Sequence, residues 1–201
     1  MKIIGGIYKG MNLYTPQDAD IRPALARMKN SLFNILMGEF EDKKVLDLFA
    51  GTGSLGFEAI SRGAKNCLFV ENHQLCLESI RENISKLRLE NVARVLLMDA
   101  FDIISYATKN DEKFDYIFID PPYRYYDEKP IKEKLLRLID DLAGKNIITQ
   151  NGMIIVEHRT KQIKGDEFNN LEVVDSRDYG QTALSFLKRS KLTTKAQRAQ
   201  R

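Results

Sequence analysis

Three glycines stand at GxGxxG spacing in the stretch Asp47-Leu48-Phe49-Ala50-Gly51-Thr52-Gly53-Ser54-Leu55-Gly56. The residues before them, 44–49, read as a buried strand, and residues 55–62 read as a helix. Glycines let a backbone turn tightly and approach a ligand closely, while the start of a helix presents free N–H groups. The stretch therefore predicts a cofactor-binding loop at the carboxyl end of a first parallel strand.

The sequence around this loop alternates short apolar runs with longer amphipathic stretches, the pattern of a mostly parallel sheet covered by helices on both faces. We expect further strands at 67–70, 94–98, 116–119 and 153–157, and further helices near 74–87, 101–108 and 130–142. Two later runs, 171–176 and 183–188, predict a closing hairpin at the sheet edge. The fold class predicted is a Rossmann-like α/β fold.

The residues before the first strand read as a separate unit. Strands are expected at 2–8 and 12–14 with a turn at Lys9-Gly10, followed by a helix over 23–37 that opens at Pro23. The expected organisation is a hairpin-helix extension over 1–43 on the substrate side, a cofactor-binding domain over 44–190 and a basic tail over 191–201.

Composition bounds the class of protein. With 201 residues and 43% hydrophobic content, the chain can bury one α/β core of ordinary size. Its apolar runs are far shorter than the roughly 20 residues that cross a bilayer, so a cytoplasmic protein without membrane contact is expected. Cys67 and Cys76 lack the clustering that zinc requires, which predicts inert buried thiols and no metal.

Charge is unevenly distributed along the chain. Residues 1–34 hold five Lys/Arg and two Asp, and residues 187–201 hold six Lys/Arg and no acid. Since the net charge is +3, the middle of the chain carries −6. Two basic ends around an acidic middle favour contact with a polyanion, although a basic tail can also serve only solubility.

Three carboxylates indicate which cofactor the loop takes. Glu71 stands 20 residues after Gly51, where it can accept hydrogen bonds from an adenosine ribose, which NAD and S-adenosylmethionine share. Asp47 lies inside the strand, where dinucleotide folds are usually apolar, and it can face an ammonium group. Asp99 can accept from the adenine amine, or it can cap a helix. The predicted S-adenosylmethionine contacts are Asp47, Phe49, Gly51, Thr52, Gly53, Glu71, Asn72, Asp99, Ala100 and Phe101.

The fourth strand ends in Asp120-Pro121-Pro122-Tyr123, which predicts the catalytic residues. An exocyclic amine on a base is a poor nucleophile, and acceptors for both of its hydrogens make its lone pair available. The Asp120 carboxylate and the Pro121 carbonyl can be those acceptors. Pro122 stiffens the strand exit and Tyr123 can stack on the base. The alternative is an ordinary proline turn.

These residues resemble the bacterial guanine-N2 methyltransferases of small-subunit ribosomal RNA. The resemblance rests on Ile3-Ile4-Gly5-Gly6, Arg22-Pro23, Ser31-Leu32-Phe33-Asn34, the glycine loop, the Asp-Pro-Pro-Tyr tetrapeptide and Tyr179-Gly180-Gln181-Thr182. It implies a class I methyltransferase fold with a seven-stranded, mostly parallel sheet and an antiparallel closing strand. It also implies methyl transfer to guanine N2 of 16S ribosomal RNA. The substrate is expected to be this RNA, either naked or in an assembling 30S subunit, and the enzyme is expected to be a monomer.

The predicted RNA contacts are basic residues near both ends of the chain. Arg22, Arg27 and Lys29 belong to the N-terminal helical segment, called the front helix here, and Lys188, Arg189 and Lys191 lie near the C-terminus. The family usually has polar residues where this chain has Ala24 and Ala26. Three other functions stay open: a DNA adenine or cytosine amino-methyltransferase, an NAD-dependent oxidoreductase, and a ribosome assembly factor without turnover. Neither His73 nor His158 is expected to be catalytic, and both are expected at the surface or behind the site.

Overall fold

The computed structural model describes residues 1–16, 23–36 and 40–190. Its strands are β1 (Lys44–Leu48), β2 (Asn66–Glu71), β3 (Ala93–Leu97), β4 (Phe114–Ile119), β5 (Ile148–Arg159), β6 (Leu171–Tyr179) and β7 (Thr182–Arg189). Its α-helices are α1 (Pro23–Ile35), α2 (Ser54–Ser61), α3 (Gln74–Leu87), α4 (Ile103–Lys109), α5 (Arg124–Asp127) and α6 (Lys129–Gly144). Two short 3₁₀ turns, η1 (Ala100–Asp102) and η2 (Gly165–Glu167), complete the described elements.

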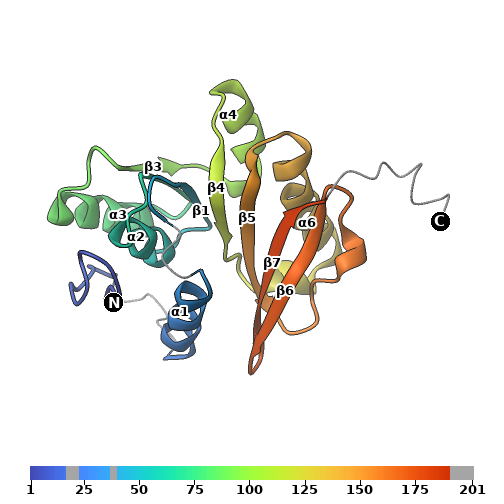
Figure 1. Cartoon of the computed structure of the whole chain (residues 1–201), viewed down its shortest axis with the longest axis horizontal. Coiled ribbons are helices and arrows are strands. Elements are labelled where there is room, and N and C mark those ends of the chain that lie inside the picture. The colour runs from blue at the N-terminus through green and yellow to red at the C-terminus, as the bar shows by residue number, and fades with distance from the viewer. Residues whose placement is uncertain (17–22, 37–39, 191–201) are drawn as a thin grey trace.

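Within the described residues the strands form one seven-stranded sheet in the order β3-β2-β1-β4-β5-β7-β6 (Figure 1). Strands β1 to β5 are parallel to one another, and β7 pairs antiparallel with both β5 and β6. The expected α/β fold with a mostly parallel sheet is confirmed. The expected antiparallel strand is also present, but it lies inside the sheet, because β6 takes the edge.

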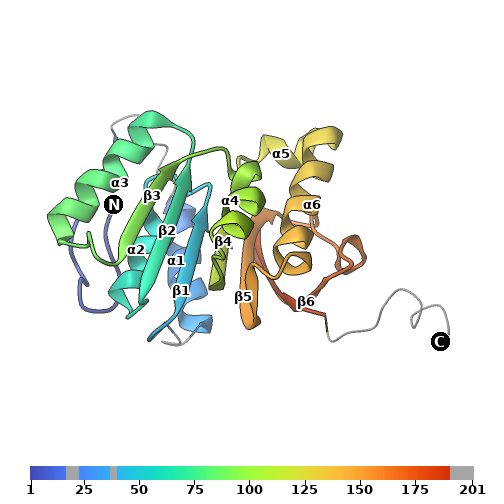
Figure 2. The same ribbon diagram turned by 90° about the horizontal axis from the view of Figure 1, so that it is seen from above.

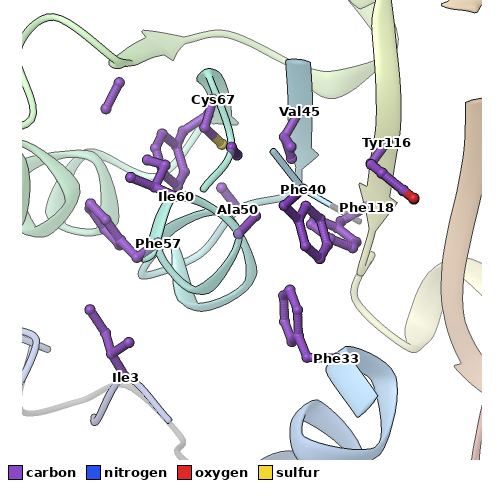
Figure 3. Packing of buried hydrophobic residues seen from close by; sticks show 14 of the residues in the cluster. Ile3, Phe33, Phe40, Val45, Ala50, Phe57, Ile60, Cys67, Tyr116 and Phe118 are labelled. Atoms are coloured by element: carbon purple, nitrogen blue, oxygen red, sulfur yellow. The ribbon is translucent and has the colours of Figure 1, made fainter. Parts of the chain in front are cut away.

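Helices cover both faces of the sheet, as the alternation of apolar runs predicts (Figure 2). On one face, Phe33 of α1 and Phe57 of α2 share a buried cluster with strand side chains such as Phe118. The rings of Phe40 and Tyr116 in this cluster lie 4.9 Å apart, and Figure 3 shows their packing. On the other face, α4, α5 and α6 pack over the remaining strand side chains, Leu48 and Ile119 among them.

The predicted N-terminal hairpin is present but shorter than expected. Residues 1–3 pair antiparallel with residues 11–13 around the Lys2–Asn12 bridge: the Ile3 N–H donates to the Met11 carbonyl oxygen (3.0 Å) and the Leu13 N–H to the Met1 carbonyl oxygen (2.7 Å). The pairing does not extend over residues 4–8, because the N–H groups of Ile4, Ile7 and Tyr8 donate to α2, at Glu58 Oε2, Ser61 O and Ser61 Oγ. The segment is therefore fixed both to residues 11–13 and to the end of α2.

Other boundaries differ by a few residues. Strand β5 begins at Ile148, five residues before the expected start, and its register with β4 shifts between Phe114 and Tyr116. The short helix α5, which follows the two prolines, was not expected. Among the described residues no helix is long and apolar enough to cross a membrane. Cys67 is buried as expected, but Cys76 is only half-buried, and burial raises the pKa of both thiols.

Candidate active site

The carboxyl ends of the parallel strands bring the glycine loop and the Asp-Pro-Pro-Tyr segment together. Strands β1 and β4 are neighbours with Leu48 paired to Ile119, and the Asp120 N–H lies 3.4 Å from the Leu48 carbonyl oxygen. Because β7 runs antiparallel, it begins at this same edge, where Thr182 pairs with Arg159 of β5. Ligands of open α/β sheets bind at such an edge.

Asp47 holds the glycine loop from inside the sheet. Its carboxylate accepts a hydrogen bond of 2.9 Å from the Gly56 N–H in the first turn of α2. The side chain is only 2% exposed, and burial raises the pKa of this carboxyl to about 8. Gly51 and Gly53 have φ of 54° and 78°, a left-handed region in which glycine costs little. The predicted contact of Asp47 with a ligand ammonium group stays a prediction.

Glu71 ties the end of β2 to the loop. Its carboxylate accepts hydrogen bonds from the N–H groups of Gly51 (2.7 Å), Asn72 (2.9 Å) and His73 (2.8 Å). A Cβ atom placed on Gly51 would meet nothing within 4 Å, so there is open space over the loop next to this carboxylate. A buried acceptor beside an open cradle suits an adenosine ribose, and the residues present fit the adenosine part of S-adenosylmethionine.

An aromatic cluster lies beside the loop, formed by residues that follow β1, β3 and β4. The ring of Phe49 lies edge-on to Phe101 (6.1 Å) and to Tyr125 (5.9 Å), and Phe101 and Tyr125 are stacked at 6.0 Å. The Lys134 ammonium lies 4.0 Å from the centre of the Phe101 ring. Sequence reasoning missed Tyr125 and Lys134, since the short helix α5 that brings Tyr125 here has no helical period to read.

Asp99 caps the 3₁₀ turn η1. Its Oδ1 accepts from the Phe101 N–H at 3.0 Å, which is the helix-cap alternative, while the side chain remains exposed. Ala100 is buried behind it. A contact of Asp99 with an adenine amine is compatible with this geometry and stays a prediction, as does the role of Thr52.

Tyr123 closes the tetrapeptide against the last strands. Its hydroxyl donates to Glu157 Oε1 at 3.1 Å and lies 2.6 Å from Thr182 Oγ1. The guanidinium of Arg159 lies 5.4 Å from the centre of the Tyr123 ring. Pro121 is buried, and Pro122 is exposed. The sequence singled out Thr182 only as part of a motif, and no spacing rule could find Glu157, because strand pairing alone brings it to Tyr123.

The two histidines differ in exposure and in hydrogen bonding. His158 is 1% exposed, which excludes the surface position and leaves the expected position behind the site; Nδ1 pairs with the Arg159 carbonyl oxygen at 2.7 Å and Nε2 with Ser185 Oγ at 2.8 Å. Burial lowers the pKa of this imidazole, which keeps it neutral. His73 is exposed at the start of α3.

The predicted RNA contacts differ in burial and in their partners. Lys29 is only 4% exposed, its Nζ lies 3.5 Å from Glu58 Oε2, and it donates to the Lys2 carbonyl oxygen at 3.1 Å. The prediction that Lys29 contacts RNA is therefore wrong, because its charge is used inside the protein. Arg22, the Arg27 side chain and Lys191 lie outside the described residues. Lys188 is exposed, whereas Arg189 donates to the Ile148 carbonyl oxygen.

Comparison with known proteins places this arrangement in a family. The family model described as "Conserved hypothetical protein 95" matches residues 1–188. A putative rRNA methyltransferase of Bacillus subtilis is 33% identical over 94% of this chain and 99% of its own. Ribosomal RNA small subunit methyltransferase D of Haemophilus influenzae is 33% identical over 78% of each chain. A solved putative methyltransferase of Escherichia coli superimposes with a TM-score of 0.76 at 27% identity, covering 94% of this chain and 97% of that one. The chain therefore belongs to the family of the small-subunit ribosomal RNA methyltransferases D.

Proposed function

We propose that this protein transfers a methyl group from S-adenosylmethionine to the exocyclic N2 amine of a guanine in small-subunit ribosomal RNA. The observation that carries the proposal is the pairing of β1 with β4, which puts Asp120 beside the glycine loop. Family membership supports ribosomal RNA as the substrate class. The exocyclic amine is inferred from the chemistry of the Asp-Pro-Pro-Tyr segment, and guanine from the resemblance to the guanine-N2 methyltransferases.

The chain's own residues supply alignment and charge. The Asp120 carboxylate and the Pro121 carbonyl accept the two hydrogens of the amine, which directs its lone pair away from the ring and stabilises the positive charge that develops on nitrogen. Tyr123 stacks against the base and sets its plane. The bound cofactor supplies an activated methyl group that needs no further activation. Most of the remaining acceleration comes from holding amine and methyl in line.

A base that reaches Asp120 must leave its stack. The target guanine is therefore expected in a loop or a junction, where extrusion costs less than the few kcal/mol typical of a duplex. The exposed Arg124, which follows Tyr123 in the chain, and the half-exposed Arg159, whose guanidinium lies 5.4 Å from the centre of the Tyr123 ring, can hold the flanking phosphates.

The test uses 16S ribosomal RNA and 30S subunits from a strain that lacks this protein. The purified enzyme and radiolabelled S-adenosylmethionine are added to each, and the labelled nucleotide is identified by mass spectrometry of nuclease digests. We expect N2-methylguanosine at a single position that is unmodified in the deletion strain. Label on adenine or cytosine amines, or on DNA in a parallel reaction, would contradict the guanine assignment.

A further inference from the structure

The hydroxyl of Tyr123 is the meeting point of side chains from two strands. Tyr123 follows β4, Glu157 belongs to β5 and Thr182 opens β7. The antiparallel pairing of β5 with β7, with Arg159 opposite Thr182 and Glu157 opposite Leu184, brings both side chains to the same place. The distances from Tyr123 Oη are 2.6 Å to Thr182 Oγ1 and 3.1 Å to Glu157 Oε1.

These hydrogen bonds have a defined direction. Tyr123 Oη–H donates to the Glu157 carboxylate, so the same oxygen accepts from the Thr182 hydroxyl. Glu157 is itself fixed: its side chain is 4% exposed, and its carbonyl oxygen accepts from Tyr126 Oη at 2.9 Å. Thr182, Tyr123 and Glu157 therefore form a directed chain that ends on a buried group.

A fixed hydroxyl restricts the ring that carries it. The prolines before Tyr123 stiffen the backbone, but they leave the side-chain torsions of the tyrosine to its surroundings. Two hydrogen bonds at the far end of the ring, together with the Arg159 guanidinium 5.4 Å from its centre, select one orientation. A base that stacks on this ring lies parallel to it, so the orientation of the ring sets the plane of the base. A misplacement of about 1 Å can cost on the order of a hundredfold in rate.

We propose that Thr182 and Glu157 are positioning residues that act through Tyr123 to set the plane of the target base. The proposal rests on the proposed function, in which Tyr123 stacks with that base. It gives the two ends of the Tyr179-Gly180-Gln181-Thr182 motif separate tasks. Tyr179 bonds through its hydroxyl to Ser31 of α1, whereas Thr182 serves the reacting base.

The test is a set of isosteric substitutions assayed on 30S subunits or 16S ribosomal RNA from the deletion strain. Thr182→Val keeps the shape of the side chain and removes its hydroxyl, and we expect kcat to fall about tenfold while the KM for S-adenosylmethionine is unchanged. Thr182→Ser keeps the hydroxyl and should retain most of kcat. The matched control is Thr160→Val, because Thr160 Oγ1 donates its proton to the Gly180 carbonyl oxygen, in the turn that precedes Thr182; its kcat should equal that of the wild type.

A double-mutant cycle separates positioning from a general loss of structure. If Thr182 acts through the tyrosine hydroxyl, then Thr182→Val lowers kcat in the wild type and adds nothing in a Tyr123→Phe background. Full kcat in Thr182→Val, or an equal loss in both backgrounds, would overturn the proposal. The same four proteins also give equilibrium constants for urea unfolding, whose coupling between the two sites should be about two- to tenfold. A wild type that methylates neither substrate would refute the proposed function, and the unfolding cycle would still decide whether the contact couples Thr182 to Tyr123.

Discussion

At the scale of single residues, Asp120 carries the largest expected effect. Its carboxylate interacts with the amine more strongly as charge develops on nitrogen, so the interaction lowers the barrier more than it favours binding. For Asp120→Ala we expect turnover to fall at least about a hundredfold while the dissociation constant for S-adenosylmethionine changes by less than about tenfold. Asp120→Asn is the matched control, since it keeps one acceptor oxygen and should lose less. Single-turnover kinetics and calorimetry measure the two quantities, and near wild-type turnover in the alanine variant would remove Asp120 from the reaction.

The raised pKa of Asp47 predicts that the stability of the fold depends on pH. Burial raises the pKa of this carboxyl to about 8 in the folded protein, whereas an unfolded aspartate titrates near 3.9. The stabilising contribution of Asp47 to the free energy of unfolding is thus complete below about pH 4. It is lost as pH rises through 8, because the folded state must either keep the proton or bury a charge. Asp47→Asn removes this titration and keeps an acceptor for the Gly56 N–H.

The measurement compares urea unfolding of the wild type and Asp47→Asn at pH 5 and pH 8. The variant should gain stability relative to the wild type by on the order of 3 kcal/mol over this interval. A difference between the two proteins that stays constant with pH would show that Asp47 titrates normally. Other carboxylates affect both proteins alike, so they cancel in the comparison.

At the scale of elements, the short loops were predictable and the tertiary contacts were not. Periodicity located every strand from β1 to β7, and the prediction of a cofactor loop between β1 and α2 needed only glycine spacing and the flanking pattern. Lys29 shows the limit: on a helix it reads as a solvated basic residue, and only the packing of α1 on α2 reveals that it is buried beside Glu58. The N-terminal hairpin is shorter than predicted for the same reason, since α2 takes the backbone hydrogen bonds of Ile4 and Tyr8.

Glu58 joins three separate segments, so its substitution is expected to lower the stability of the fold strongly. This carboxylate has no exposed surface, and it accepts from the Ile4 N–H (2.9 Å) and pairs with Arg62 (2.9 Å) and Lys29 (3.5 Å). Glu58→Gln leaves a buried lysine without its counter-charge, which costs on the order of 3–5 kcal/mol. Adding Lys29→Met to this variant should recover part of the loss, because the burial of an unpaired charge is removed. Additive losses in chemical denaturation would contradict the pairing.

At the scale of the whole molecule, the distribution of charge predicts how RNA is held. The basic residues at the two ends of the chain are expected to contact phosphates while the carboxyl edge of the sheet takes the base. Each phosphate contact steepens the slope of log affinity against log salt by about 0.7 for single strands and 0.9 for duplex. Since Lys29 is buried, the prediction for the front helix now depends on Arg22 and Arg27.

The test compares the wild type with an Arg22→Ala/Arg27→Ala variant on a loop-bearing RNA across a salt series. Two lost contacts should flatten the slope by about 1.4–1.8. The control, Lys65→Ala/Lys113→Ala, removes the same charge from exposed residues that precede β2 and β4, at the opposite edge of the sheet from Asp120, and should leave the slope unchanged. If both variants shift the slope equally, net charge and not a defined surface governs binding.

The same guanine closed into a duplex should be methylated more slowly by all three proteins, because the base must first leave its stack. Equal rates on loop and duplex would rule out recognition of an exposed base.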